Sequence, residues 1–428
     1  MKQLLLFIVM QLVLGICIHP QLYAISKNLS QESDKDDVII RVGANQSFTS
    51  INKAIESAPS GTTIVVEAGI YSEGEIIIDK PITLIGEGLP VIDGERKGYI
   101  FIIRADNVTV NGFEIKNTGQ SYVRDFAAIM IERSKDFTIE NNVIDDVFFG
   151  IYLAQTQGGI IRGNRIESYD LREASSGNGI HLWSVKDPQI IENEVYGMRD
   201  GIYLEFAENA VIHGNISNNN NRYGLHYMFS NGGSYYNNTF NRNGAGVAVM
   251  YSEGVEMKNN VFEHNWGGSA YGLLLKDIRN STISGNRFYK NTVAIYSEAS
   301  TNVEITQNHI ELNGWAVNIK SNSFNNRFTR NNFIENSLDV RTDSPRNHNL
   351  FEGNYWSNYD GYDLDRDGVG DIPYRPVSLF SVIIEKQPES LILLRSMFIR
   401  LLDTAERIMP VLTPKTLFDE KPSMERIK

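Results

Sequence analysis

The feature of the sequence that most constrains its fold is a short phrase that recurs at a nearly constant interval. In this phrase an Asn is followed by one variable residue and then by an apolar residue. The phrases begin at Asn142, Asn164, Asn193, Asn238, Asn260, Asn286, Asn308, Asn332 and Asn354. The steps from 142 to 164, 238 to 260, 286 to 308 and 332 to 354 are each 22 residues. One turn of a parallel β-helix is about this long, and the longer steps leave room for inserted loops.

A second phrase, a Gly followed by alternating apolar residues, lies between the Asn phrases. It starts at Gly150, Gly179, Gly201, Gly224, Gly246 and Gly272. Because side chains alternate along a strand, the first and third residues after each Gly should enter the core. The Asn residues should then turn the corners and hydrogen-bond to one another along the solenoid. Together these periods predict an all-β protein, a right-handed parallel β-helix over residues 38–360.

A short amphipathic segment precedes the repeats. A solenoid end exposes its core and an unpaired strand edge, so it needs a cap. A helix over residues 50–58 would place four apolar residues on one face: Ile51, Ala54, Ile55 and Ala58. Pro59 to Gly61 should end this helix before a strand from Thr63 to Glu67. We expect this helix to be the N-terminal cap.

Residues 1–24 have the features of a cleaved signal peptide. Lys2 precedes an apolar run from Leu4 to Ile18, which ends near a small-residue site at Ala24. No later stretch offers the roughly 20 apolar residues of a membrane-spanning helix. The single cysteine, Cys17, lies in the segment to be removed, so we expect neither disulfides nor a thiolate metal site. The mature chain should be soluble and periplasmic.

After the last Asn phrase, residues 361–376 form an acidic loop. Its carboxylates alternate with other residues and are followed by Gly368: Asp363, Asp365, Asp367 and Asp371. Hard oxygen ligands around a Gly that permits a tight turn are typical of a calcium loop. The alternative is an acidic surface turn without an ion. A bound calcium would fix the C-terminal end of the solenoid, because no nucleophile or base is evident beside it.

The segment 387–428 differs again from the repeats. From Leu391 to Met409, six residues at helical spacing form an apolar stripe among charged ones: Leu391, Leu394, Phe398, Leu401, Ala405 and Ile408. This amphipathic helix could cap the last rung, or it could dock on a membrane-embedded partner. Prolines at 410, 414 and 422 then favour an extended tail, which suits contact with another protein.

The most informative side chains should lie on the outer face of the middle rungs, at the second and fourth positions after each Gly. Met228 and Met250 should be direct neighbours on rungs about 4.8 Å apart, and His226 lies roughly 6.5 Å along the strand from Met228. Thioether and imidazole donors select copper(I), whereas calcium and magnesium ignore them. We therefore predict a copper(I) site at His226, Met228 and Met250. Three residues of the same face are possible neighbours of this site: His181, Trp183 and Glu205.

Two alternatives to this copper site remain. Outward methionines also form adaptable apolar contact patches. A register shift of one residue would bury the same side chains in the core.

Several longer phrases carry a family resemblance over nearly the whole mature chain. They are 179–183, 199–203, 222–228, 250–252, the stretch from Asp365 to Pro376, and the ending at 394–396, 400–403, 405–407 and 410–414. In this order they resemble the NosD family of nitrous oxide reductase maturation proteins. The rung phrases occur in many β-helix proteins, but the ending is more specific.

The resemblance implies a periplasmic accessory protein that partners an ATP-binding-cassette transporter. That transporter would consist of the ATPase NosF and the membrane subunit NosY, and the chain would reach the membrane through this partner. The implied role is delivery of copper to nitrous oxide reductase while its copper–sulfide centre is assembled. The lipoprotein chaperone NosL would supply the metal. A relay must release its ion, which suits a shallow, partly open site.

Other function classes fit the sequence less well. The formal net charge of −12 argues against binding nucleic acid. Polysaccharide lyases, hydrolases and epimerases also use long β-helices, but they need carboxylate pairs or a strong base converging in a groove. The candidates here, Glu205, Lys276 and Glu298, fall on separate rungs. A passive surface adhesin would leave the C-terminal helix and tail unexplained. We therefore expect an accessory protein and no enzymatic activity.

Overall fold

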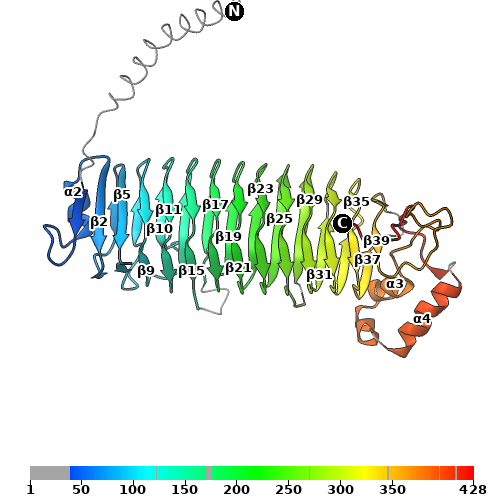
Figure 1. The fold of residues 1–428 in the computed structure, drawn as a ribbon. Coiled ribbons are helices and arrows are strands. Elements are labelled where there is room, and N and C mark those ends of the chain that lie inside the picture. Colours follow the sequence, from blue (N-terminus) through cyan, green and yellow to red (C-terminus); the bar gives the residue numbers. More distant parts are fainter. Residues whose placement is uncertain are drawn as a thin grey trace, which may run out of the picture.

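The computed structural model describes residues 39–121, 123–169, 176–268, 270–344, 347–394, 396–409 and 412–428. In these ranges the chain forms a long solenoid whose named strands all pair in parallel (Figure 1). The predicted all-β fold, a right-handed parallel β-helix, is confirmed. The predicted signal peptide, residues 1–24, lies outside the described residues.

Three sheets form the sides of the solenoid, here called sheets A, B and C. Within the described ranges sheet A has 14 strands, sheet B has 13 and sheet C has 12. Sheet A consists of β1 Ile39–Val42, β2 Thr62–Glu67, β5 Ile82–Glu87, β8 Thr109–Asn111, β11 Thr138–Glu140, β14 Ile160–Arg162, β17 Gln189–Ile191, β20 Val211–His213, β23 Ser234–Tyr236, β26 Glu256–Lys258, β29 Thr282–Ser284, β32 Glu304–Thr306, β35 Arg327–Thr329 and β38 Leu350–Glu352.

Sheets B and C complete each turn. Sheet B consists of β3 Ile70–Tyr71, β6 Val91–Asp93, β9 Glu114–Lys116, β12 Val143–Asp145, β15 Arg165–Glu167, β18 Glu194–Tyr196, β21 Ile216–Asn218, β24 Thr239–Asn241, β27 Val261–Glu263, β30 Arg287–Tyr289, β33 His309–Glu311, β36 Asn332–Ile334 and β39 Tyr355–Trp356. Sheet C consists of β4 Ile76–Ile78, β7 Phe101–Ile103, β10 Ala127–Glu132, β13 Phe149–Ala154, β16 Ile180–Trp183, β19 Asp200–Glu205, β22 Tyr223–Met228, β25 Ala245–Glu253, β28 Tyr271–Arg279, β31 Val293–Glu298, β34 Trp315–Ile319 and β37 Leu338–Thr342.

The strands of sheet C follow the phase predicted from the Gly phrases. On β22 the residues that enter the core are Leu225 and Tyr227, and on β25 they are Val247 and Val249. All four are fully buried. Full burial of an apolar side chain of this size stabilises the fold by about 1.5–3 kcal/mol. The repeated burial along the solenoid therefore fixes the register, and with it the set of side chains that face outward.

A ladder of buried asparagines holds the turns together. The backbone N–H and the side-chain amide of Asn215 both donate to Oδ1 of Asn238 on the next turn, each at 2.9 Å. The same amide donates to the carbonyl of Ile190 at 2.9 Å. Each step thus satisfies polar groups that would be costly to bury alone. The ladder comprises Asn142, Asn164, Asn193, Asn215, Asn238, Asn260, Asn286, Asn308, Asn331 and Asn354.

One position of the predicted ladder is shifted by a residue. Asn331, not Asn332, makes the ladder bonds to Asn308 and Asn354. In the Asn331-Asn332 doublet, the residue that turns the corner is the one two positions before the inward Phe333. The side chain of Asn332 instead bonds to the backbone of Ile427 near the end of the chain.

The N-terminal cap is a short helix, as predicted. α2 Ile51–Ser57 begins at Ser50, whose hydroxyl accepts a hydrogen bond from Lys53 N, and ends at Ala58. It buries Ile51, Ala54 and Ile55. The predicted strand from Thr63 is β2, which begins one residue earlier.

The C-terminal segment contains three helices among the described residues where the sequence predicts one. They are α3 Leu379–Lys386, the 3-10 helix η2 Pro388–Leu393 and α4 Met397–Ile408. The predicted helix from Leu391 to Met409 is interrupted because Ser396 caps a new start, accepting a hydrogen bond from Ile399 N. Figure 1 shows α3 and α4 beside the last strands of sheet C. No helix in the described ranges is long and apolar enough to cross a membrane.

These helices pack on the outer face of sheet C at its C-terminal end. Phe380, Ile384 and Ile399 form a small core with three residues of the outer face of sheet C: Val293, Trp315 and Leu338. Glu385 of α3 pairs with Arg341 of β37 and lies 3.9 Å from Nζ of Lys320. This end of the sheet is therefore covered, whereas its middle is not covered by these helices.

The tail, which the prolines predict to be extended and suited to contact with another protein, instead returns to the last rung of the same chain. The carboxylate of Asp419 accepts hydrogen bonds from the backbone N–H and side-chain amide of Asn354, at 3.0 and 2.9 Å, and from the indole N–H of Trp356 at 3.0 Å. Asp419 is fully buried and ends the asparagine ladder. Figure 1 accordingly places the C-terminus beside β39. The end of the tail is thus part of the C-terminal cap.

Candidate metal site on sheet C

The residues predicted to bind copper lie in the middle of the outer face of sheet C. β22 carries His226 and Met228, and β25 carries Met250. The register pairs Met228 with Met250 and His226 with Ala248. The two thioethers therefore occupy equivalent positions on successive turns, whose backbones are about 4.8 Å apart. Both Met side chains are half-buried.

The three predicted neighbours lie on the two preceding rungs. β16 carries His181 and the exposed Trp183, and β19 carries the half-buried Glu205. Trp183 pairs with Glu205, and Glu205 pairs with Met228. One column therefore contains Trp183, Glu205, Met228 and Met250 in order, and a parallel column contains His181 and His226.

The imidazole column is more enclosed than the sequence predicts. Strand alternation predicts that His181 and His226 face solvent. They do lie outside the core, but their exposed fractions are only 8% and 2%. The ring of Tyr203 lies between them, with its centroid 4.7 Å from that of His181 and 4.8 Å from that of His226. The predicted solvent exposure of these imidazoles is wrong, because the ring of Tyr203 on the intervening rung packs against both, tilted to His181 and edge-on to His226.

His226 has one partnered and one unpartnered ring nitrogen. Nδ1 lies 3.4 Å from Oδ2 of Asp200, a carboxylate that is itself fully buried. Nε2 is buried and has no hydrogen-bond partner among the described residues. A buried polar atom without a partner costs roughly 1–3 kcal/mol. An imidazole nitrogen of this kind is a suitable donor for a soft metal ion, so the residues present fit copper(I).

His181 has a different set of partners. The side-chain amide of Asn178 donates to Nδ1 of His181 at 2.8 Å. The amide orientation follows from Arg199, whose Nε donates to Oδ1 of Asn178 at 3.2 Å. Burial, and then the positive charge of Arg199, lower the pKa of His181 to about 3. The ring is neutral at physiological pH, and its Nδ1 lone pair is already engaged.

A tyrosine hydroxyl connects the two columns. The hydroxyl of Tyr203 lies 3.8 Å from the sulfur of Met228 and donates to it. Burial, followed by the negative charge of Glu205, raises the pKa of Tyr203 to about 12, so the phenol keeps its proton. One sulfur thus has a weak polar contact from the protein, and its second lone pair remains for other partners.

Sequence reasoning missed a row of aromatic residues next to the methionines. Phe206, Phe229 and Tyr251 each follow the fourth position of a rung, and their rings stack at centroid distances of 5.4 and 4.9 Å. All three are exposed and have left-handed backbones, with φ near 50°. Aromatic residues rarely adopt this conformation. The signal in the sequence was an aromatic residue immediately before an Ala or Ser at successive corners.

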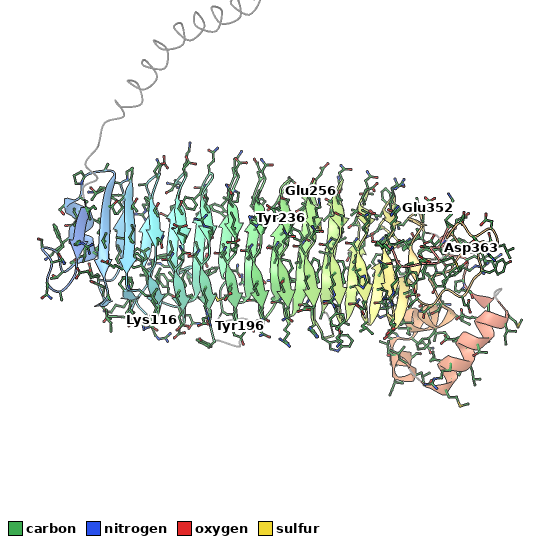
Figure 2. All side chains as sticks on the ribbon, in the orientation of Figure 1. Lys116, Tyr196, Tyr236, Glu256, Glu352 and Asp363 are labelled. Carbon is green, nitrogen blue, oxygen red and sulfur yellow. The ribbon has the colours of Figure 1, made fainter. Side chains whose placement is uncertain are left out.

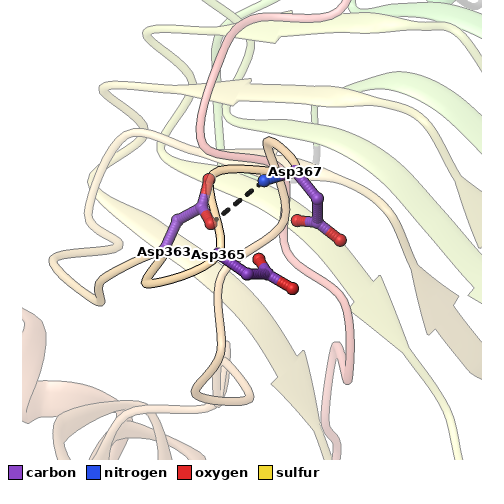
Figure 3. A group of neighbouring side chains, drawn as sticks. All are labelled: Asp363, Asp365 and Asp367. Atoms are coloured by element: carbon purple, nitrogen blue, oxygen red, sulfur yellow. Dashed lines mark hydrogen bonds between the residues drawn. The ribbon is translucent and has the colours of Figure 1, made fainter.

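The acidic loop lies beyond the last rung, where Figure 2 shows Asp363 at the C-terminal end of the solenoid. Ligand atoms of Asp363, Asp365 and Asp367 all lie within 4.8 Å of one another (Figure 3). Backbone N–H groups of Asp367 and Gly368 donate to the carboxylate of Asp363 at 3.2 and 2.9 Å. The charge of Asp367 raises the pKa of Asp365. Asp371, the fourth predicted ligand, instead accepts a hydrogen bond from Leu364 N at 2.8 Å.

The residues considered for sugar chemistry form no carboxylate pair. Lys276 and Glu298 are paired in register, with Nζ and Oε1 3.9 Å apart. The hydroxyl of Tyr296 also donates to Glu298 at 3.1 Å. Glu205 lies three rungs from Lys276 in the same column. The arrangement is one ion pair and a separate carboxylate.

Comparison with known proteins identifies relatives of this chain. Residues 168–361 match the family described as "Periplasmic copper-binding protein (NosD)", and residues 15–184 match the "Right handed beta helix region". A protein of Pseudomonas aeruginosa named "Probable ABC transporter binding protein NosD" is 31% identical over 380 residues, which cover 83% of this chain and 87% of that protein. The chain belongs to the NosD family.

A second NosD, from Stutzerimonas stutzeri and of the same name, is 29% identical over 381 residues, 84% of this chain and 86% of that protein. Both NosD relatives are named as binding proteins. Among solved structures, the A-module of the mannuronan C-5 epimerase AlgE4 of Azotobacter vinelandii aligns with a TM-score of 0.51 at 16% identity. That alignment covers 70% of this chain and 92% of the A-module. At this identity the likeness shows the shared β-helix fold alone.

Proposed function

We propose that this member of the NosD family is a periplasmic accessory protein that binds copper(I) on the outer face of sheet C. The copper would be cargo, delivered for assembly of the copper–sulfide centre of nitrous oxide reductase. Two observations carry this proposal: Nε2 of His226 is buried and unpartnered among the described residues, and Met228 on the same strand pairs in register with Met250. The description of the matching family as copper-binding supports it.

The donor set suits a transient site. Two thioethers and one imidazole match the soft character of copper(I), which needs no charged ligand. Met228 and Met250 are half-buried, so an incoming ion would reach the two sulfurs from solvent first. It would then bind the buried ring of His226. His181, Trp183 and Glu205 would border the site. A partly open site of this kind can pass its ion to another protein.

Anaerobic titration with copper(I) against a chromophoric chelator tests the copper site. The unsubstituted protein should bind one copper(I) tightly. The double variant Met228→Ala/Met250→Ala should lose at least about tenfold in affinity for copper(I). Met397→Ala removes an exposed thioether on α4 and is the matched control, with affinity unchanged. An unchanged affinity for copper(I) in the double variant would contradict the proposed copper site. Turnover of a polysaccharide without copper binding would favour the carbohydrate-active alternative.

We also propose that the exposed face of α4 docks on the membrane subunit of an ABC transporter, NosY, which works with the ATPase NosF. The chaperone NosL would supply copper to sheet C. The support for docking is an apolar face with no partner among the described residues: Met397, Leu401 and Ile408 are 76%, 60% and 75% exposed. Exposed apolar surface of this kind marks interaction sites. The names of the relatives refer to ABC transporter binding.

Co-purification from detergent-solubilised membranes tests the docking face. Leu401→Glu/Ile408→Glu should abolish capture of the membrane subunit, because two carboxylates would be buried in an apolar contact. Arg400→Glu on the polar side of α4 is the control and should retain capture. Equal capture by both variants would contradict the assignment. These substitutions are preferable to deleting residues 387–428, because that deletion would also remove Asp419 from the cap.

We propose that the acidic loop binds a structural calcium ion through Asp363, Asp365 and Asp367, with Asp371 closing the loop. The loop contacts the tail: Val369 bridges Ser423, and Gly370 N donates to the carbonyl of Pro422 at 2.8 Å. Calcium would therefore stabilise the C-terminal cap. Calorimetric titration should show binding that Asp365→Asn/Asp367→Asn removes, and no heat in the unchanged chain would refute it.

A further inference from the structure

We propose that Asp200 is a positioning residue that fixes the proton of His226 on Nδ1, so that the Nε2 lone pair is available to a soft metal ion. This inference rests on the proposed copper function and deepens it. It also assigns different roles to two histidines that the sequence places in one column: His226 is the ligand, and His181 is a structural residue.

The surroundings of Asp200 make it a hydrogen-bond acceptor. Its Oδ1 accepts a hydrogen bond from Tyr223 N at 3.2 Å and lies 4.0 Å from Nε of Arg222. Oδ2 lies 3.4 Å from Nδ1 of His226. Because a carboxylate can only accept, the hydrogen must be on Nδ1.

The lone pair on Nε2 of His226 is then available to a metal ion. A neutral imidazole with its proton on Nδ1 has its lone pair on Nε2. Nε2 is the buried ring nitrogen that has no partner in the described part of the chain. Carboxylates commonly orient metal-binding histidines in this way, through the nitrogen that does not bind the metal. The buried Asp200–His226 pair therefore has the arrangement of a metal ligand with its supporting carboxylate.

His181 has the opposite arrangement, which explains why it is excluded. Arg199 donates to Oδ1 of Asn178, so the amide of Asn178 must donate to Nδ1 of His181. The proton of the neutral ring is therefore on Nε2, and the Nδ1 lone pair is occupied. In this tautomer His181 offers no free lone pair to a metal. A carboxylate and an amide, each beside Nδ1, thus select opposite tautomers two rungs apart.

Nuclear magnetic resonance of the metal-free chain tests the tautomers directly. The chain has seven histidines, which selective ¹⁵N labelling with His226→Gln and His181→Gln can assign. In the unchanged chain, Nδ1 of His226 and Nε2 of His181 should show the shifts of protonated nitrogens. Asp200→Asn should move the proton of His226 from Nδ1 to Nε2. The oxygen of the new amide would accept from Tyr223 N, so its N–H₂ would face Nδ1, as the amide of Asn178 faces Nδ1 of His181. His226 with its proton on Nε2 in the unchanged chain overturns the inference, even if Asp200→Asn does not fold.

Copper affinity gives the second readout. Asp200→Asn should weaken copper(I) binding by about 10- to 100-fold while the melting temperature of the solenoid changes little. Asn178→Asp is the matched control, and it should move the proton of His181 from Nε2 to Nδ1 without weakening copper binding. If the proton of His226 moves to Nε2 but the affinity for copper(I) is unchanged, Asp200 is not a positioning residue. If the unchanged chain binds no copper(I), the proposed function fails and the metal role of His226 fails with it, whereas the tautomer result is decided independently.

Discussion

The asparagine ladder and the histidine column both repeat from rung to rung, but they differ in how completely their polar atoms are satisfied. Asn215 bonds to Asn193, Asn238 and Ile190, so its buried amide has partners on every side. His226, equally buried, leaves Nε2 without one among the described residues. The ladder can therefore be explained by stability alone. The unpartnered Nε2 of His226 does not contribute to stability in this way.

The largest effect that would sharpen this comparison is expected in the ladder. Asn215→Ala removes the acceptor of the Asn193 backbone N–H and side-chain amide, and it removes the amide donor to the carbonyl of Ile190. Each unsatisfied buried group costs about 1–3 kcal/mol, so the free energy of unfolding should fall by about 4 kcal/mol. Urea denaturation measures this value. A loss below about 1 kcal/mol would mean that the ladder does not hold the turns together.

A smaller effect is expected where the ladder ends. Asp419→Ala should lower stability by about 3 kcal/mol, because Asn354 and Trp356 lose their shared acceptor. Hydrogen exchange should locate the loss in the last rung. Asp419→Asn is the matched variant: its amide oxygen can still accept from Asn354 and Trp356, but its N–H₂ would face Gly353 N and Lys421 N, which Oδ1 accepts at 3.1 and 3.2 Å, so it should lose less than Asp419→Ala. Equal losses in the two variants would show that charge, not the ladder geometry, closes this end.

A pH-dependent contribution should come from Asp339 on β37. Burial raises its pKa to about 6, although the hydroxyl of Tyr374 donates to it at 2.7 Å. Because the pKa is raised in the folded state, the proton stabilises the fold at low pH, and this contribution is lost as pH rises from about 4 through 6. The loss should be between about 2 and 3 kcal/mol at neutral pH. Asp339→Asn should remove this dependence in unfolding curves at pH 5 and 7.5. An unchanged pH dependence would place its source elsewhere.

Much of the fold follows from short-range periodicity, which is why the sequence predicts it. The Gly phrases give the inward phase of Leu225 and Tyr227, and the same phase pairs Met228 with Met250. The partner of His226 could not be predicted in this way. Asp200 lies on the preceding strand at the position before its Gly, where other rungs have Tyr223 or Ala245. The repeat pattern does not specify which outward side chains contact one another.

Contacts distant in sequence were also beyond the reach of periodicity. Asp419 joins the ladder 65 residues after Asn354, and the tail alone gives no sign of that partner. The helix predicted from Leu391 starts instead at Met397, because Ser396 offers a local cap that competes with the apolar pattern. In both cases a specific hydrogen bond decides the structure, and the apolar pattern only limits the choices.

X-ray absorption spectroscopy of the copper(I)-loaded chain identifies the ligands of the copper directly. We expect one imidazole nitrogen and two sulfur scatterers around the copper, with the sulfur signal lost in Met228→Ala/Met250→Ala. The nitrogen signal should be retained in His181→Gln and lost in His226→Gln. A first shell of nitrogen and oxygen without sulfur, or one that depends on His181, would show that copper(I) does not bind at His226, Met228 and Met250.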